Sequence, residues 1–425
     1  MRRTPFPVMS FLVMVWFFLS GCSGSQGLPG PLGPAGSAGP IGPPGPSGEN
    51  ASASQTYIGM DACGECHEEL FASFSLSGHP FALTKIENNQ PPEIPYADIS
   101  GGLPSPPEGY TWDDITYVIS GYGWKARFIG ADGYILTGDE GAATQYNFAN
   151  EKVGVAAEWV PYHSGEQISF DCATCHTTGY VPQGHQDNLD GISGSWALPG
   201  VQCERCHGPG SLHATDPQGI RMVVERASQL CGDCHANDNP ALIDASNGFE
   251  MNQLQFEDLY NSRHFALDCI DCHDPHASAH FADETVNPNK GLRQMCETCH
   301  WKNEAVQNNR KHLGVDCIDC HMPPMAKSAQ GNLDLFIADV RSHQFAINTD
   351  PDAPQFSDDG LFVMPYLTLT YACGHCHNGE SAGVKDGEIM AAVAEGYHTK
   401  QTPTPEPSPT SEGATETAVT PTPES

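Results

Sequence analysis

One five-residue pattern, Cys-x-x-Cys-His, occurs eight times in this chain of 425 residues and constrains its fold more than any other feature. The eight copies use sixteen of the seventeen cysteines, and only Cys22 is left over. We number them motifs 1 to 8 in chain order: Cys63, Cys66 and His67; Cys172, Cys175 and His176; Cys203, Cys206 and His207; Cys231, Cys234 and His235; Cys269, Cys272 and His273; Cys296, Cys299 and His300; Cys317, Cys320 and His321; Cys373, Cys376 and His377.

This pattern is the attachment signature of c-type haem. The two thiols bond covalently to one porphyrin edge, and the adjacent histidine supplies an axial ligand to iron. A zinc ribbon pairs two Cys-x-x-Cys units without needing a histidine after each second cysteine. A disulfide framework would not put every cysteine at this spacing. We therefore predict eight covalent haem c groups, each with the histidine of its motif as proximal ligand.

The haems also shape the predicted fold, because the chain offers little apolar material for a core. It is 39% hydrophobic and contains 44 Gly and 35 Pro, a thin supply for this length. We predict a mainly α and irregular multihaem fold whose core is filled by haem. Residues 110–160 are the exception, since β-branched and aromatic residues around an Ala131-Asp132-Gly133 turn predict a small β hairpin or meander. Trp124, Lys125 and Arg127 in this segment either cover a haem, hold a propionate or are ordinary strand residues.

The first residues form an export signal, predicted over residues 1–21. Arg2 and Arg3 precede a short apolar run, which is shorter than a membrane span requires. The following Leu19-Ser20-Gly21-Cys22 resembles the processing box of bacterial lipoproteins. That resemblance implies a lipidated Cys22 and routing to the outer membrane, because no Asp follows the cysteine. An ordinary cleaved signal with an incidental cysteine is the alternative.

Two low-complexity segments flank the haem domain, which we place at residues 57–398. Residues 22–56 contain eight consecutive Gly-x-y triplets from Gly27 to Asn50, the collagen pattern. They form either a homotrimeric triple helix or a single extended spacer spanning about 70 Å. Residues 399–425 are rich in Thr, Pro and Glu and are predicted to be disordered.

The histidine count is sufficient to give every iron a second axial ligand. Of nineteen histidines, eight are proximal and His375 lies inside motif 8, which leaves ten. Bis-histidine ligation is therefore the simplest prediction. His264 and His312 each stand five residues before a Cys-Ile-Asp-Cys-His motif, in RHFALDCIDCH and KHLGVDCIDCH, which indicates a shared role. The distal candidates are His79, His163, His213, His264, His276, His312, His343 and His398, with His280 competing with His276 and His185 a weaker candidate.

The placement of His79 twelve residues after motif 1, and the phrase SRHFALDCIDCHDPH, resemble the cytochrome c-554 and hydroxylamine oxidoreductase superfamily of multihaem cytochromes. The resemblance implies that histidines upstream of a motif reach haems bound elsewhere in the chain. It also admits an alternative function, because the group includes octahaem oxidoreductases in which one iron has an open distal position. Such an enzyme would act on a small nitrogen or sulfur compound. The chain lacks the Cys-x-x-Cys-Lys motif of pentahaem nitrite reductases, and no catalytic residue is assigned.

The net charge of −33 excludes nucleic acid as a partner, since phosphate binding needs a basic face. An acidic surface suits basic partners and positively charged surfaces. We predict an electron-transfer protein at the cell surface or in the periplasm, attached to the membrane by its lipid anchor. Its expected partners are other cytochromes or redox proteins, or an extracellular acceptor such as a metal oxide.

Overall fold

The computed structural model describes residues 55–237, 239–283, 285–303, 312, 314–379 and 382–398. All of them belong to one compact unit, Ser54–Ser425. The predicted signal peptide, Cys22, the Gly-x-y segment and the tail from residue 399 lie outside the described residues. Within the described part, no helix combines the length and apolar character that a membrane crossing needs.

Each motif is built on one turn of helix, which brings its two thiols and its imidazole to the same side. The motif histidine donates its amide to the carbonyl of the first cysteine, for example from His235 to Cys231 and from His300 to Cys296, both at 2.8 Å. Residues separated by three and four positions share a helix face, so both thiols and the imidazole point to the same side. The motif helices are α2 (Met60–Gly64), α5 (Ala173–His176), α6 (Cys203–His207), α8 (Ser228–Gly232), α10 (Cys269–Cys272), α11 (Glu297–His300), α13 (Cys317–His321) and α14 (Leu369–Gly374).

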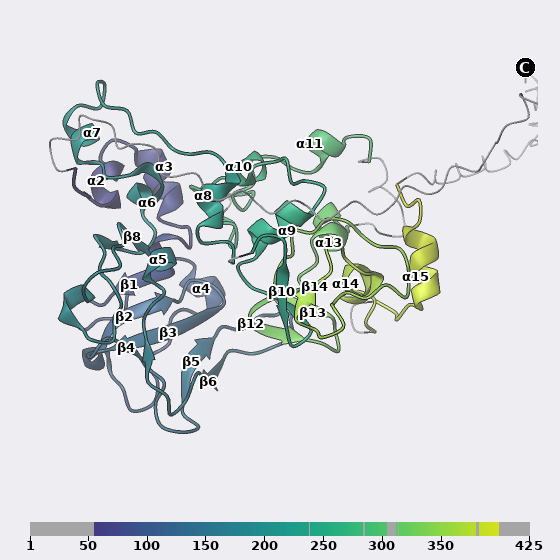
Figure 1. Cartoon of the computed structure of the whole chain (residues 1–425), viewed down its shortest axis with the longest axis horizontal. Helices are drawn as coiled ribbons and strands as arrows, with labels where there is room; N and C mark the ends of the chain where they lie inside the picture. The colour runs from purple at the N-terminus through teal and green to yellow at the C-terminus, as the bar shows by residue number, and fades with distance from the viewer. Residues whose placement is uncertain are drawn as a thin grey trace, which may run out of the picture. The chain divides into compact units, whose positions relative to one another are not determined.

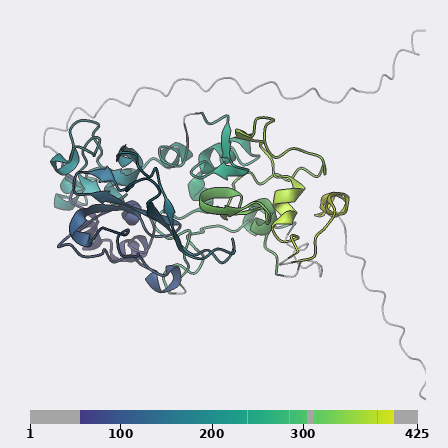
Figure 2. The same ribbon diagram turned by 90° about the horizontal axis from the view of Figure 1, so that it is seen from below.

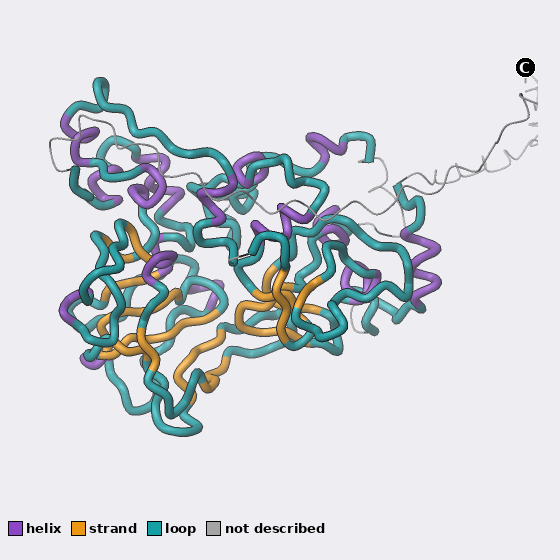
Figure 3. Tube along the Cα trace, viewed as in Figure 1, coloured by secondary structure: helices purple, strands orange, loops and turns teal. Residues whose placement is uncertain are grey.

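The other helices are also short, with eight residues in the longest of those described, and long loops join them (Figure 3). Helix α3 follows directly after motif 1, and its Phe74 is buried. The remaining described helices are α3 (Glu68–Phe74), α4 (Ala97–Ser100), α7 (Ser211–Thr215), α9 (Gln255–Asn261) and α15 (Gly387–Ala394), with 3-10 turns at Pro80–Ala82, Trp112–Asp114 and Gln186–Asn188.

The predicted β region is the centre of a seven-stranded antiparallel sheet (Figure 1). The strand order is β1-β2-β3-β4-β7, and β5 pairs with both β3 and β6. The predicted turn lies between β3 and β4, where Gly133 has φ 87° and donates its amide to Gly130 at 3.0 Å. The strands are β1 (Leu83–Lys85), β2 (Ile115–Ser120), β3 (Lys125–Gly130), β4 (Tyr134–Ile135), β5 (Ala143–Asn147), β6 (Glu158–Pro161) and β7 (Ile168–Ser169).

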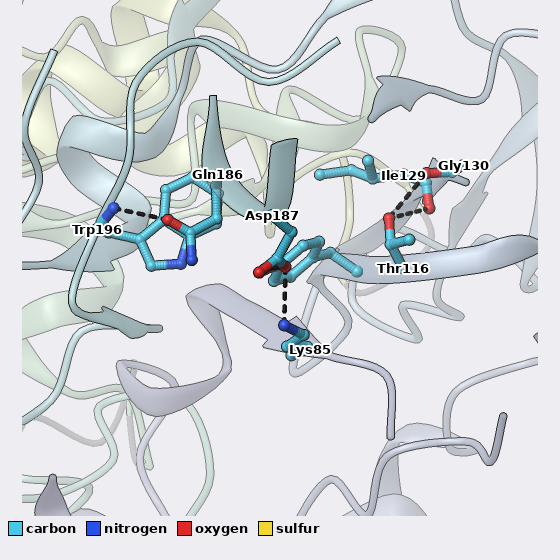
Figure 4. Close-up of polar contacts among 8 residues, drawn as sticks. Lys85, Thr116, Ile129, Gly130, Gln186, Asp187 and Trp196 are labelled. Atoms are coloured by element: carbon cyan, nitrogen blue, oxygen red, sulfur yellow. Dashed lines mark hydrogen bonds and ion pairs between the residues drawn. The ribbon is translucent and has the colours of Figure 1, made fainter. Parts of the chain in front are cut away.

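A polar contact fixes the Gln186–Asn188 turn to this sheet (Figure 4). The Asp187 carboxylate accepts hydrogen bonds from the Tyr117 hydroxyl at 2.5 Å and from Lys85 Nζ at 2.7 Å. Burial would raise the pKa of Asp187, but the hydrogen bonds from Lys85 and Tyr117 hold it below its ordinary value. On the same turn, the Gln186 side chain accepts a hydrogen bond from the Trp196 amide at 2.9 Å.

A second, five-stranded sheet was not predicted, so the expectation of a mainly α and irregular fold was wrong in this respect (Figures 1 and 2). Its order is β13-β12-β11-β10-β14, and β11 and β12 are parallel. Motifs 5 to 7 separate these two partners in sequence, so no hairpin signal joins them. The strands are β10 (Ile243–Ser246), β11 (Phe249–Met251), β12 (Ala326–Asn332), β13 (Ile337–Val340) and β14 (Phe362–Val363), and β8 (Thr177–Thr178) pairs with β9 (Leu198–Pro199) apart from both sheets.

Apolar clusters on the two sheets carry the helices of two motifs. On the first sheet, Phe170 and Ala173 of the motif 2 region pack in a cluster with Ile192. On the second sheet, Ala372 is buried in a cluster against which Cys373 of motif 8 packs. Part of the core is therefore made of protein side chains, which the low hydrophobic content had not led us to expect.

Candidate haem-binding site

One continuous cavity of about 3650 Å³ connects the motifs. All eight motif histidines line it, and so does every motif cysteine except Cys172. The motif helices thus direct their thiols and imidazoles towards a common space rather than into separate sites.

Seven of the eight motif histidines face a second histidine across part of this cavity. The distances between ring centroids fall in a narrow range, although the partners come from unrelated positions in the sequence. The pairs are His67 with His213 (6.3 Å), His207 with His276 (6.2 Å), His235 with His79 (6.4 Å), His273 with His343 (6.1 Å), His300 with His264 (6.0 Å), His321 with His398 (5.8 Å) and His377 with His312 (6.3 Å).

This spacing fits one metal ion held between two imidazoles. Two metal–nitrogen bonds of about 2.0 Å each, with about 1 Å from each nitrogen to its ring centre, give a centroid separation of roughly 6 Å. Several rings also use Nδ1 to bind the protein, as His176 does with the Ala82 carbonyl at 2.7 Å and His321 with the Phe345 carbonyl at 2.6 Å. Such bonds fix the ring and leave Nε2 for a metal. The residues present therefore fit haem iron with two axial histidines.

The structure brings seven of the eight predicted distal histidines to a motif histidine. His163 is not among them, because its half-exposed ring packs on Tyr162 at 4.7 Å and contacts Glu166 at 3.3 Å. His264 and His312 do not face the motifs that directly follow them. His280, the competitor of His276, lies instead against Trp124, with the ring centroids 4.7 Å apart and the rings tilted.

Motif 2 differs from the others, because among the described residues no aromatic ring stacks against His176. Its surroundings are cationic. Burial lowers the pKa of His176, and the charges of Arg127 and Lys125 lower it further. Burial also lowers the pKa of Lys125 to about 8. Lys125 donates to the Ser328 carbonyl at 2.5 Å.

Arg127, the second cation near motif 2, is held firmly by its neighbours. Its guanidinium lies 3.7 Å from the centre of the Tyr162 ring and donates to Gln145 at 2.6 Å. Trp124 in turn donates to the Asp339 carbonyl at 2.9 Å. All three residues for which the sequence left a haem-covering, a propionate-binding and an ordinary strand role open therefore have protein partners of their own.

Known proteins share parts of this sequence and this fold. The family model for cytochrome c554 and c-prime matches residues 142–208, which contain motifs 2 and 3. The chain is a multihaem c-type cytochrome. Its fold is similar to that of the outer cell wall cytochrome OcwA, with a TM-score of 0.50, 18% identity and coverage of 79% of this chain and 86% of that one. It is also similar to the octaheme sulfite reductase MccA of Wolinella succinogenes, with a TM-score of 0.52, 17% identity and coverage of 81% and 69%. No curated protein sequence matches the chain.

The thiols of this cytochrome show which motifs are neighbours in space. Pairs of cysteine side chains close enough to shift each other's pKa join motif 1 to motif 3, motif 2 to motif 4, motif 4 to motif 5 and motif 6 to motif 7. For example, the nearby Cys269 raises the pKa of Cys231. Electrostatic contacts between thiols add the steps from motif 3 to 4, 5 to 6 and 7 to 8. The motifs therefore follow the order 1-3-4-5-6-7-8, with motif 2 as a branch at motif 4.

Proposed function

We propose that this cytochrome transfers electrons through eight covalently attached haem c groups, seven of them held by two histidines. The observation that carries the proposal is the set of seven imidazole pairs, 5.8–6.4 Å apart, along one continuous cavity that all eight motifs line. Histidines with unrelated structural roles would not be expected to pair at nearly the same ring-to-ring distance, or at the distance that one metal ion between two imidazoles requires.

Haem iron, when bound, supplies reversible one-electron oxidation and reduction. The role of the chain is to fix the position and the ligands of each iron. The seven imidazole pairs would hold each iron from both sides and leave it no open position, which favours electron carriage over substrate binding at those seven sites. The contacts between thiols bring successive motifs together, which supports a continuous route along the order 1-3-4-5-6-7-8.

We further propose that the protein works outside the cytoplasm, attached through a lipid on Cys22 and held off the membrane by the Gly-x-y segment. Residues 1–21 and the processing box support export and lipidation. OcwA, of similar fold, is described as an outer cell wall cytochrome. Electrons would pass to other cytochromes or to an extracellular acceptor such as a metal oxide, and the Gly-x-y segment would allow a homotrimer.

Haem counting combined with electron paramagnetic resonance tests the electron-transfer proposal. We expect eight haems per chain by pyridine haemochromogen assay, with seven low-spin bis-histidine signals at low temperature. His163→Ala is the matched control and should leave the spectrum unchanged, because His163 faces Tyr162 and Glu166. Fewer than eight haems, or several high-spin signals in the wild type, would contradict the proposal.

Motif 2 supports a second candidate function, an oxidoreductase site for a small nitrogen or sulfur compound. The specific observation is that His176 has no stacked ring opposite it among the described residues, while Lys125 and Arg127 give its surroundings a positive charge. MccA, of similar fold, is a sulfite reductase by its description. If this site is open, nitrite, hydroxylamine or cyanide will change the spectrum of one haem, and replacing Cys172 and Cys175 by alanine, which prevents haem attachment at motif 2, will abolish that change. If none of the three ligands alters any haem signal, motif 2 belongs to the electron-carrying set alone.

A further inference from the structure

Glu204, the second residue of motif 3, is a buried carboxylate with an unusual set of partners. Its side chain is 2% exposed. It accepts hydrogen bonds from the backbone amides of Ile58 at 3.0 Å, Gly59 at 2.9 Å and Gly210 at 2.6 Å. Three amide donors suit the ionised form, because a carboxylate only accepts hydrogen bonds. Among the described residues no cationic side chain pairs with it, and the neighbouring Arg205 pairs with Asp233 instead.

The three amides lead into two elements that belong to motif 1. Ile58 and Gly59 directly precede α2, which carries Cys63. Gly210 directly precedes α7 (Ser211–Thr215), which carries His213, and His213 faces His67 at 6.3 Å. Glu204 itself is part of α6 of motif 3. A single carboxylate therefore joins the attachment helix of motif 1, the histidine opposite its iron position and the attachment helix of motif 3.

Two glycines make this close approach of backbone and carboxylate available. Gly59 has φ 83°, a conformation that residues with side chains rarely adopt. At Gly210, a Cβ atom would stand only 3.2 Å from a Glu204 carboxylate oxygen and 3.2 Å from Ile58. Two of the three donors are thus glycines, at positions where an amide must approach the buried acid without a side chain in the way.

The charge of Glu204 also acts on the two attachment sites that it joins. The Cys63 and Cys203 thiols contact each other, and the carboxylate lies within electrostatic range of both. A buried charge is poorly screened, because the effective dielectric constant around it is far below that of water. An anion in this place stabilises the ferric state, which carries one more positive charge than the ferrous state.

We propose that Glu204 is a positioning residue that holds His213 and motif 1 in register with motif 3 and lowers the reduction potentials of the two haems attached there. The inference rests on the proposed attachment of haem at these motifs. It adds a role for a residue that lies between two cysteines of the motif and ligates nothing.

Potentiometric titration followed by low-temperature electron paramagnetic resonance tests the inference on the full holoprotein. Glu204→Gln keeps the size and removes the charge, so we expect two of the eight potentials to shift upward. Glu204→Asp keeps the charge but shortens the side chain, so we expect a high-spin signal from one haem as His213 loses its position, with the potential of the motif 3 haem near the wild-type value. Glu65→Gln is the matched control, because it removes an exposed carboxylate from motif 1, and it should produce a smaller shift.

The outcomes separate the inference from the proposed function. A wild-type protein with fewer than eight haems would defeat the proposed function itself. Eight haems with wild-type potentials in Glu204→Gln, or with shifts no larger than in Glu65→Gln, would overturn the electrostatic role. If Glu204→Gln does not assemble, the Glu204→Asp protein decides, and an unchanged low-spin spectrum in that variant would overturn the positioning role.

Discussion

Replacing His264 with alanine tests whether this histidine serves the motif that it faces in space or the motif that follows it in sequence. His264 stands five residues before motif 5, yet its ring lies 6.0 Å from His300 of motif 6. We therefore expect His264→Ala to convert one haem from low spin to high spin, and that haem to be the one attached at motif 6. The fold should survive, because His264 Nδ1 has no hydrogen-bond partner that the change would strand.

The magnitude follows from counting haems in double variants. His264→Ala alone should remove one-seventh of the low-spin intensity, since one of the seven paired-histidine sites is affected. Combining it with His300→Ala should still affect a single haem, because both side chains serve motif 6. Combining it with His273→Ala should affect two haems, or two-sevenths of the low-spin intensity, because His273 pairs with His343. Residues that act on one site give non-additive effects, and residues on separate sites give additive ones.

The assay is low-temperature electron paramagnetic resonance with spin quantification, on samples whose haem content has been measured by pyridine haemochromogen. Equal haem content across the three proteins is the control for incomplete attachment. If the His264 and His273 changes together affect one haem, while the His264 and His300 changes affect two, then His264 serves the motif that follows it. That result would refute the spatial pairing.

Three further outcomes follow from other parts of the chain. Asp187→Asn should lower the free energy of unfolding by about 2 kcal/mol, because it removes a charged hydrogen-bond partner from the Tyr117 hydroxyl. The half-exposed ion pair with Lys85 adds little. Urea unfolding measures the difference, and Asp190→Asn, at an exposed position, is the control. Since the folded pKa of Asp187 is depressed, the difference between wild type and variant should be constant above about pH 4 and vanish as the pH falls through the folded pKa. Protein produced without haem-attachment machinery should be cut rapidly by protease, because the cavity of about 3650 Å³ would lack its contents, and a protease-resistant apoprotein would contradict this. Deleting residues 27–50 should leave the haem spectrum and electron transfer unchanged and alter only assembly, and sedimentation of the soluble form would show whether a trimer is lost.

The attachment motifs could be read from the sequence because each is completed within one helical turn. The two thiols and the imidazole of a motif need only separations of three and four residues, which local backbone geometry provides. The turn at Gly133 is a local feature as well, and it was predicted correctly. The parallel pairing of β11 with β12 is different, because it depends on residues such as Glu250 and Ala326 meeting across three motifs.

Distal partners are harder to predict, since a lone histidine carries no local signal of the direction in which its ring will point. The sequence offered both His163 and His79 as distal candidates, and only His79, twelve residues after motif 1, did so with a family resemblance. In the structure, His79 is partly buried and faces His235 of motif 4, whereas His163 is half exposed beside Glu166. Tertiary packing decides between them.

The internal repeat around His264 and His312 contains information about which motif each of these histidines faces in space. His264 precedes motif 5 and faces motif 6, and His312 precedes motif 7 and faces motif 8. In both copies the ring of the histidine faces the motif histidine of the second motif after it, and not that of the motif that directly follows it. The separation along the chain is not kept, because His300 is 36 residues after His264 while His377 is 65 residues after His312. Strands β12, β13 and β14 lie between motifs 7 and 8, so the second sheet occupies the longer connection while the pairing rule remains the same. The repeat therefore preserves which motif each histidine faces rather than the distance to it, and a search for equal spacing would have missed it.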